Sequence, residues 1–305
     1  MTILVFEQLL NGLQLGLMLF MLAAGLTLIF GIMDFVNLAH GTLYMVGAFM
    51  AVVFVSLTGS YVLALPLAVL ATAAVGVLLD RLLLHRLYGH NHLRQVLATF
   101  GLIMVFNDLF KFIFGSNTLM LEVPQALSGP VHLWGNFYYS AYRLVVIGAG
   151  VLTALGLGLL ITRTRLGMWI RAGASDRDMA RAMGVNIELI YTLVFALGAG
   201  LCGLAGALLG PLLSVHVGMG ESIIILAFVV VVIGGAGSVK GALLGALAIG
   251  MLDTMGRSML PHVMRSLWPS LSIDALAPAL AAILTYALMA AVLFWRPEGL
   301  FKTTS

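Results

Sequence analysis

Apolar runs of about twenty residues recur along the whole chain, and they restrict its fold more than any other feature. Each run is long enough to cross a hydrocarbon core of about 30 Å as a helix, in which the backbone polar groups are paired. Segments of alternating polarity, which a membrane β-barrel requires, are absent from the sequence. We therefore expect an all-α integral membrane protein, a polytopic bundle of eight or nine spans. The candidate spans are residues 10–32, 41–58, 61–83, 95–115, 143–162, 188–211, 222–236, 240–257 and 275–295.

No long soluble segment separates these spans, so residues 1–305 are expected to form a single transmembrane domain. The 35 glycines suit such a bundle, because small residues let helices approach closely in lipid. The lone Cys202 lies in an apolar run and excludes an intrachain disulfide. The first ten residues carry Glu7 and no basic residue, so we expect no cleaved signal peptide and a permanent first span.

Basic residues gather in a few connections, and their distribution predicts the orientation. Five of the fifteen Lys and Arg residues lie in the loop 163–187. The 84–94 connection and the C-terminal tail carry further basic residues, whereas the 116–142 connection carries none. Since Lys and Arg favour the cytoplasmic side, the loop 163–187 and the C-terminus are expected in the cytoplasm. Arg257 and Arg265 then fall outside, against the rule. The same distribution accounts for the basic pI of about 9.2, so no nucleic-acid partner is expected.

Two breaks interrupt the apolar pattern, near 31–41 and near 234–241. If the first break is a cytoplasmic loop, nine crossings place the N-terminus outside. If it lies within a re-entrant or discontinuous helix, about eight crossings place the N-terminus inside. Paired interrupted helices point to a transport site, so the two breaks form a candidate internal repeat. The glycines expected to interrupt the helices are Gly31, Gly41, Gly234, Gly235, Gly237 and Gly241.

Polar side chains at membrane depth are candidates for a translocation path, because a polar group is costly there. The candidates are Asn37, His40, Thr99 and Asn107. For Asn37 and His40 the alternative role is capping and hydrogen bonding to freed backbone carbonyls, and for Thr99 it is helix packing. Asp108 and Lys111, which follow Asn107, are expected to pair on one helix face. No acidic or metal-ligand cluster surrounds His40, so no metal site is expected.

The stretch ASDRDMARAMG within the loop 163–187 predicts a short helix. Ser175 is placed to cap it, with Asp178 at capping-box spacing, and Gly184 is placed to end it. Asp176, Ala180 and Gly184 fall four residues apart. Two interpretations remain open: an amphipathic helix on the lipid surface anchored by Trp169, or a docking helix for a cytoplasmic partner.

Signatures of membrane-embedded catalysis are missing from the sequence. The stretch GGAGSVKGA resembles a phosphate loop, but Val239-Lys240-Gly241 stands where Gly-Lys-Ser/Thr is required. No Ser-His-Asp, HExxH or paired-Cys pattern occurs. We therefore expect a non-catalytic chain without a cofactor of its own.

Four motifs in the same order resemble the H-type permease of branched-chain amino acid ABC importers. They are LTLIFGIMDFVNLAHGTLYMVGAF, TRLGMWIRAGASDRDMARAMGVN, VVVIGGAGSVKGALLGA and the terminal RPEGLF, and the resemblance covers almost the whole chain. It implies a multi-pass subunit of the bacterial inner membrane that translocates branched-chain or related amino acids. Permeases of the same architecture for urea, short amides or sugars are the alternative, and a secondary transporter is a more distant one.

The resemblance also implies partners. These are a second permease subunit, related or identical, two cytoplasmic ATPase subunits that bind ATP and Mg²⁺, and a periplasmic substrate-binding protein. By the same resemblance the Arg171–Gly184 segment is the ATPase-coupling loop. Its expected coupling residues are Arg171, Ser175, Asp176, Ala180, Met183 and Gly184.

Overall fold

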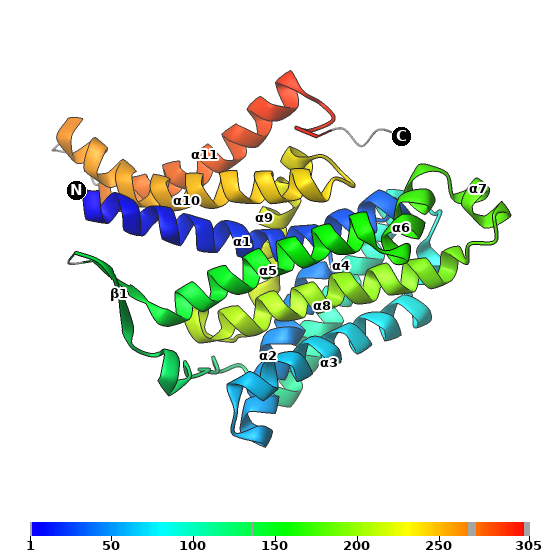
Figure 1. The fold of residues 1–305 in the computed structure, drawn as a ribbon, viewed down its shortest axis with the longest axis horizontal. Coiled ribbons are helices and arrows are strands. Elements are labelled where there is room, and N and C mark those ends of the chain that lie inside the picture. Colours follow the sequence, from blue (N-terminus) through cyan, green and yellow to red (C-terminus); the bar gives the residue numbers. More distant parts are fainter. Residues whose placement is uncertain (1, 136, 268–272, 302–305) are drawn as a thin grey trace.

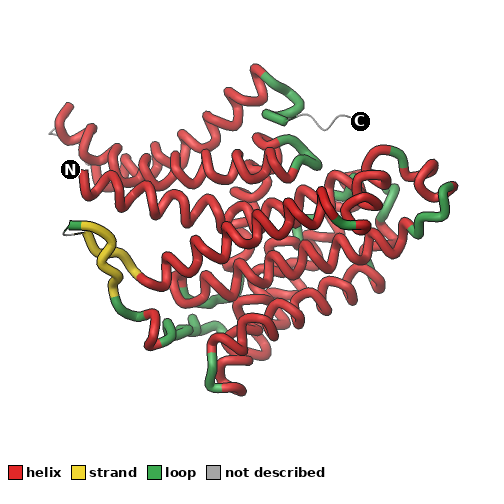
Figure 2. The backbone as a smooth tube through the Cα atoms, in the orientation of Figure 1, coloured by secondary structure: helices red, strands yellow, loops and turns green. Residues whose placement is uncertain are grey.

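The computed structural model describes residues 2–135, 137–267 and 273–301 as a helical bundle with one β-hairpin (Figures 1 and 2). The described helices are α1 (Thr2–Met33), α2 (His40–Thr58), α3 (Tyr61–Leu82), α4 (His92–Phe114), α5 (Ala141–Arg163), α6 (Arg165–Ser175), α7 (Arg177–Ala182), α8 (Ile187–Leu213), α9 (Met219–Gly234), α10 (Val239–Leu267) and α11 (Ile273–Trp295). The 3-10 helices η1 (Leu84–Leu87) and η2 (Gln125–Leu127) and the antiparallel strands β1 (Pro130–Trp134) and β2 (Phe137–Ser140) complete the described elements. The predicted all-α polytopic class is confirmed.

Among the described residues, eight helices are long and apolar enough to cross a membrane: α1, α2, α3, α4, α5, α8, α10 and α11. Helix α9 has 16 residues and is therefore about 24 Å long. This length is shorter than a hydrocarbon core of about 30 Å. The prediction of a complete span at 222–236 is therefore wrong, because α9 needs the segment that precedes it to complete a crossing.

The long helices lie roughly along one axis, so the molecule has two ends (Figure 1). At the hairpin end, Phe6 in α1 makes edge contacts with Trp134 and Phe137 beside the hairpin turn. At the opposite end, which we call the elbow end, α6 and α7 lie beyond the ends of α5 and α8 (Figure 1). There the Phe301 amide donates to the Gly234 carbonyl. The described chain thus begins at one end and finishes at the other, as nine passages require.

Helices α1 and α8 form the centre of the bundle. In their most apolar stretches 83% and 72% of the residues are buried, against 17% in α4, α5 and α11. Glycines let the central helices approach: Gly25 in α1 faces Gly198 in α8, and Gly47 in α2 faces Gly203 in α8. The peripheral helices expose Leu, Phe and Val side chains, as lipid-facing surfaces do.

Two discontinuous spans are related by a pseudo-repeat. The connection 34–39 leads from α1 into α2, and the connection 214–218 leads from α8 into α9. Each begins with a residue of positive φ, Asp34 at 51° and Ser214 at 62°, and these are the positive-φ non-glycine residues of the described chain. Helix α3 packs on α8 and α2, while α10 packs on α1 and α9. The segment α1–α2–α3 therefore corresponds to α8–α9–α10.

The predicted partner of the 31–41 break, at 234–241, is wrong. Residues 235–238 form a tight turn between α9 and α10, with φ of 97° at Gly235 and 85° at Gly237. Gly234 packs directly on Gly241 across this turn, at the elbow end. The dense glycines of 234–241 therefore belong to a close turn between two helices. The counterpart of the first break is 214–218, which has one glycine and so could not be found from glycine density.

Candidate functional site

The first unwound segment, residues 34–39, is held by side chains of α4 in place of helical hydrogen bonds. The Val36 amide donates to Gln95 Oε1 at 3.1 Å, and the Leu38 amide donates to Thr99 Oγ1 at 3.4 Å. Gln95 Nε2 in turn donates to the His90 carbonyl at 3.1 Å. A backbone amide without a partner is costly at membrane depth, so these two side chains permit the chain to run extended there.

Helix α2 begins inside the bundle rather than at its end. His40 Nε2 donates to the Leu22 carbonyl at 3.3 Å. Leu22 lies about three turns, or about 16 Å, before the end of α1. Residues 34–39 thus fold back along α1, and the 31–41 break is a discontinuous span rather than a simple loop.

The two discontinuous spans meet at this depth. Gly41 in the first turn of α2 packs against the Gly220 carbonyl in the first turn of α9, and Gly220 packs against the Gly41 carbonyl. The side chains around this junction are polar and buried: Asn37 is 1% exposed and His40 is fully buried. Both amide atoms of Asn37 and the Nδ1 atom of His40 are buried without a protein partner. His40 therefore bonds a backbone carbonyl, as its structural alternative expects, while Asn37 caps nothing.

The remaining polar candidates lie on two sides of the junction. Thr99 is fully buried and donates to the Gln95 carbonyl at 2.8 Å while it accepts from the 34–39 segment. Asn107, in the C-terminal half of α4, is half-buried and donates from Nδ2 to Glu221 Oε1 in α9. The structure thus separates Asn107 from the group formed by Asn37, His40 and Thr99.

The expected Asp108–Lys111 pair does not form. Both side chains are exposed on α4, and within the described residues the salt bridge between side chains joins Asp253 and Arg257 instead, at 2.9 Å. Arg257, which opposed the orientation rule, is thus neutralised by a neighbour one turn away on α10.

The loop 163–187 forms two short helices, α6 and α7, which together we call the elbow. The prediction that Ser175 caps the docking helix is wrong, because Ser175 is the last residue of α6. Asp176 caps α7 instead: its Oδ1 accepts from the Asp178 amide at 3.0 Å and from the Met179 amide at 2.9 Å. Asp176 can cap α7 because its backbone is extended at the boundary between α6 and α7, as the N-cap position requires.

The C-terminal end of α7 follows the prediction. Gly184 has a φ of 85°. The Gly184 amide donates to the Arg181 carbonyl at 3.0 Å, and the Val185 amide donates to the Ala180 carbonyl at 3.1 Å. These two bonds form a Schellman motif, which satisfies carbonyls that the helix would leave unpaired.

Helix α7 turns one face inward and another outward. Ala180 is 6% exposed, whereas Met179 and Met183 are 62% and 78% exposed. Arg171 in α6 is exposed, and its guanidinium donates to the Ile161 carbonyl at the end of α5. Among the predicted coupling residues Ala180 is buried, and the other five are exposed: Arg171, Ser175, Asp176, Met183 and Gly184. Asp176 and Gly184 form the two caps of α7.

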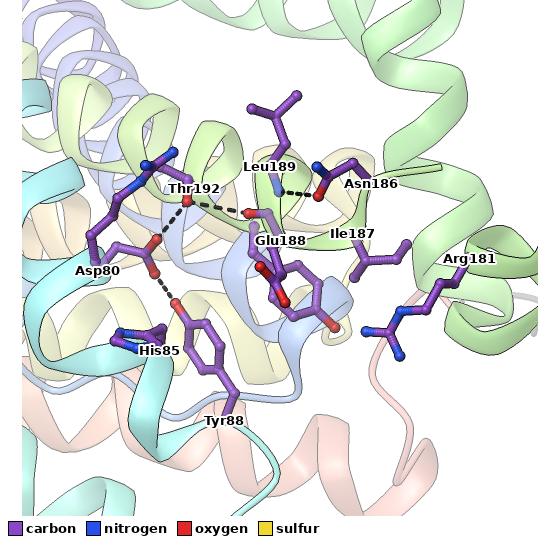
Figure 3. Close-up of a pocket in the computed structure, with 11 residues that line it drawn as sticks. Asp80, His85, Tyr88, Arg181, Asn186, Ile187, Glu188, Leu189 and Thr192 are labelled. Atoms are coloured by element: carbon purple, nitrogen blue, oxygen red, sulfur yellow. Dashed lines mark hydrogen bonds between the residues drawn. The ribbon is translucent and has the colours of Figure 1, made fainter. Parts of the chain in front are cut away.

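A cavity of about 490 Å³ lies beneath α7, between it and the elbow ends of α3 and α8 (Figure 3). Asp80, 2% exposed, is the centre of its polar lining. The Tyr88 hydroxyl donates to Asp80 Oδ1, and the Thr192 hydroxyl donates to Asp80 Oδ2 at 2.8 Å. Arg181 of α7 lies on the far side of the cavity (Figure 3).

Tyr88 also connects the elbow with the first unwound segment. Its ring makes edge contacts with Tyr191 in α8 and with Phe35, both at 5.4 Å between centroids. Tyr191 interacts in turn with the guanidinium groups of Arg177 and Arg181 on α7. Sequence reasoning missed Asp80, Tyr88 and Gln95. The one available signal was a carboxylate, Asp80, inside an apolar span.

Known proteins with similar sequences identify the family of this chain. A family model described as "Branched-chain amino acid transport system / permease component" matches residues 8–293. The chain is 30% identical to the high-affinity branched-chain amino acid transport system permease protein BraD of Pseudomonas aeruginosa, over 96% of this chain and 94% of that protein. It is 27% identical to the corresponding permease protein LivH of Escherichia coli, over 83% of this chain and 86% of the relative.

A shorter similarity reaches a sugar system. The xylose transport system permease protein XylH of Escherichia coli is 35% identical over 45% of this chain and 37% of that protein. No solved structure matches the chain. Because the family model covers nearly all described spans, including both discontinuous ones and the elbow, the chain belongs to the family of permease components of branched-chain amino acid transport systems.

Proposed function

We propose that this chain is a permease subunit of an ABC importer that carries branched-chain or related amino acids into the bacterial cell. The names of the full-length relatives support the amino acid substrate, since sugar permeases match less than half of the chain. In this proposal the chain supplies a gated path and no catalysis. Two partner ATPases bind ATP and Mg²⁺, a second permease subunit completes the pore, and a periplasmic binding protein delivers the substrate.

The elbow end faces the cytoplasm in this proposal. The loop 163–187 carries five arginines, and the C-terminal Arg296 lies at the same end. The connection between α4 and α5, at the hairpin end, carries no Lys or Arg. The positive-inside rule then places the hairpin and the N-terminus in the periplasm.

In this proposal the elbow is the docking site for the ATPases. The main support is a pair of exposed methionines on a short helix that is capped at both ends. Met179 and Met183 lie four residues apart, on one face of α7. Flexible thioethers adapt well to an apolar groove on a partner. Because α6 and α7 are held between α5 and α8, a push on α7 must reach these long helices.

A series of side-chain contacts leads from α7 to the first unwound segment. Arg177 and Arg181 of α7 interact with Tyr191, which contacts Tyr88, which contacts Phe35 in the unwound segment. Arg177 also lines a cavity together with Asp34, the strained first residue of that segment. We therefore propose that ATPase closure is transmitted to residues 34–39 and changes the access to the Gly41–Gly220 junction.

Replacement of both α7 methionines by serine tests the docking role. The variant Met179→Ser/Met183→Ser should insert into the membrane normally but lose co-purification with the ATPases and lose uptake. The matched control is Met168→Ser, a 52% exposed methionine on α6. ATPase binding by the double variant equal to that of the control would show that α7 is not the docking element.

Uptake by the reconstituted complex tests the substrate and the energy source. Proteoliposomes that contain the permeases, ATPases and binding protein should accumulate labelled leucine only with ATP, and should exclude xylose and urea. Accumulation of leucine without any ATPase would identify a secondary transporter and contradict the proposal.

A further inference from the structure

Glu221 is a carboxylate in the first turn of α9, and its depth makes it unusual. Helix α9 begins at Met219 and ends at Gly234, at the elbow end. Glu221, in its first turn, is about 20 Å from Gly234 along the helix. Its neighbour Gly220 packs on Gly41, which lies about 16 Å inside the bundle by its position beside Leu22. Glu221 is therefore near the middle of the membrane-spanning part.

At this depth Glu221 is nevertheless exposed on the surface of the single chain. Its interaction is with an amide, since Asn107 Nδ2 from α4 donates to its Oε1. Within the described residues no Lys or Arg forms an ion pair with it. Asp108, the residue after Asn107 on α4, is likewise exposed and forms no ion pair there, whereas two other carboxylates of the spans are satisfied. Asp80 accepts from two hydroxyls, and Asp253 pairs with Arg257.

An exposed carboxylate at mid-depth cannot face hydrocarbon without a large cost. Asn107 donates to the carboxylate, and the N-terminal end of the 16-residue α9 directs its dipole toward it. The face formed by α4 and α9 around Glu221 must therefore adjoin water or a cationic group rather than lipid.

We infer that the α4–α9 face around Glu221 lines the translocation path and that the Glu221 carboxylate receives the ammonium group of the amino acid in transit. This inference rests on the proposed function and names the part of the substrate that the site selects. Asn107 acts as a positioning residue, since it bridges α4 to the carboxylate and leaves the second oxygen free for the substrate. A sugar or urea lacks the cation that this site would recognise, so the site favours amino acids.

Water access can be tested without any transport. The chain contains one cysteine, the fully buried Cys202, so a Cys202→Ala background leaves a single introduced thiol to react. In the assembled complex, Glu221→Cys should react with a membrane-impermeant cationic thiosulfonate, and leucine should slow the reaction. The control, Leu152→Cys on α5, is at a 71% exposed apolar site and should not react. Absence of labelling at position 221 would overturn the inference, since the side chain would then lie against lipid or a subunit.

Uptake kinetics test the ammonium role. Glu221→Gln should raise the leucine KM for uptake by about tenfold, the loss expected for one charge-assisted hydrogen bond. Glu221→Asp should recover part of this loss, and Asn107→Ala should give an intermediate one. The control is Asp108→Asn, a change at an exposed acid beside Asn107, which should have no effect on KM.

The outcomes separate this inference from the proposed function. Wild-type uptake with an unchanged KM in Glu221→Gln would overturn the ammonium site and leave the importer intact. Loss of co-purification of the second permease in Glu221→Gln would likewise overturn it and identify a subunit contact. Failure of the wild-type complex to transport leucine would instead reject the proposed function.

Discussion

The Tyr88 side chain lies where the elbow, the first unwound segment and α3 meet. Its hydroxyl group donates the hydrogen bond to Asp80 of α3. Burial raises the pKa of Tyr88, and the hydrogen bond to Asp80 raises it further. The neutral phenol is thus the form that the fold stabilises. Its ring contacts with Phe35 and Tyr191 do not depend on the oxygen.

Tyr88→Phe should therefore lower the free energy of unfolding by about 1.5–3 kcal/mol near neutral pH, because Asp80 loses one donor. The folded pKa is raised, so the contribution is complete below the unfolded tyrosine pKa of about 10 and is lost as pH rises beyond it. Thermal unfolding of both proteins in detergent from pH 7 to 11 checks this. A difference between them that stays constant or grows above pH 10 would contradict the assignment.

For single residues, the sequence identified several of the buried polar side chains but predicted their contacts less well. His40, Asn37 and Thr99 were recognised because polar atoms in apolar runs are conspicuous. Gln95 was missed because it stands at the edge of a span, where a polar residue is ordinary. Its function depends on Val36, 59 residues away, which no local pattern reveals.

The elements are held by two devices, capped termini at the elbow and glycine contacts at the centre. Helix α7 has six residues, and among them only Ala180 is buried. Its Asp176 cap and its Schellman end therefore supply much of its order.

Gly184→Ala should destabilise α7 by about 1 kcal/mol, because alanine disfavours a φ of 85° although open space surrounds the position. Hydrogen exchange of the α7 amides should accelerate severalfold while exchange in α1 and α8 stays unchanged. The control is Gly101→Ala in α4, which has open space and ordinary helical backbone. Unchanged exchange in α7 would mean that the elbow is held by contacts rather than by its caps.

Helices α2 and α8 can cross closely because glycines stand at their contact. A Cβ at Gly206 would collide with the Tyr44 carbonyl, so Gly206→Ala should lower the free energy of unfolding by about 1–3 kcal/mol. Gly156→Ala in α5 meets no neighbour and should leave stability equal or slightly higher. Denaturant unfolding in detergent compares the two, and equal stabilities would show that α2 can move aside.

The whole molecule is a bundle in which two discontinuous spans are embedded among continuous ones (Figure 1). Helices α2 and α9 meet through Gly41 and Gly220, and each is preceded by an unwound segment. Since α3 covers α8 and α10 covers α1, each half of the repeat supports the other. Movement of one half against the other would change the junction without unpacking either.

Nine passages place the two termini on opposite sides, with the C-terminus in the cytoplasm if the elbow faces the ATPases. An epitope tag at the N-terminus should bind antibody on spheroplasts, whereas a tag at the C-terminus should bind only after permeabilisation. Protection of both tags would indicate an even number of crossings and reject the arrangement.

The sequence by itself determined the membrane class, the long spans, the position of the 31–41 break and the place of the elbow. Each of these depends on residues within one stretch, through apolar length, charge or capping spacing. Only the tertiary structure decided that 214–218, not 234–241, is the partner of 34–39, and that Asn107 meets Glu221. The residues of that contact are 114 positions apart, so their meeting depends on how whole helices pack and not on any local preference.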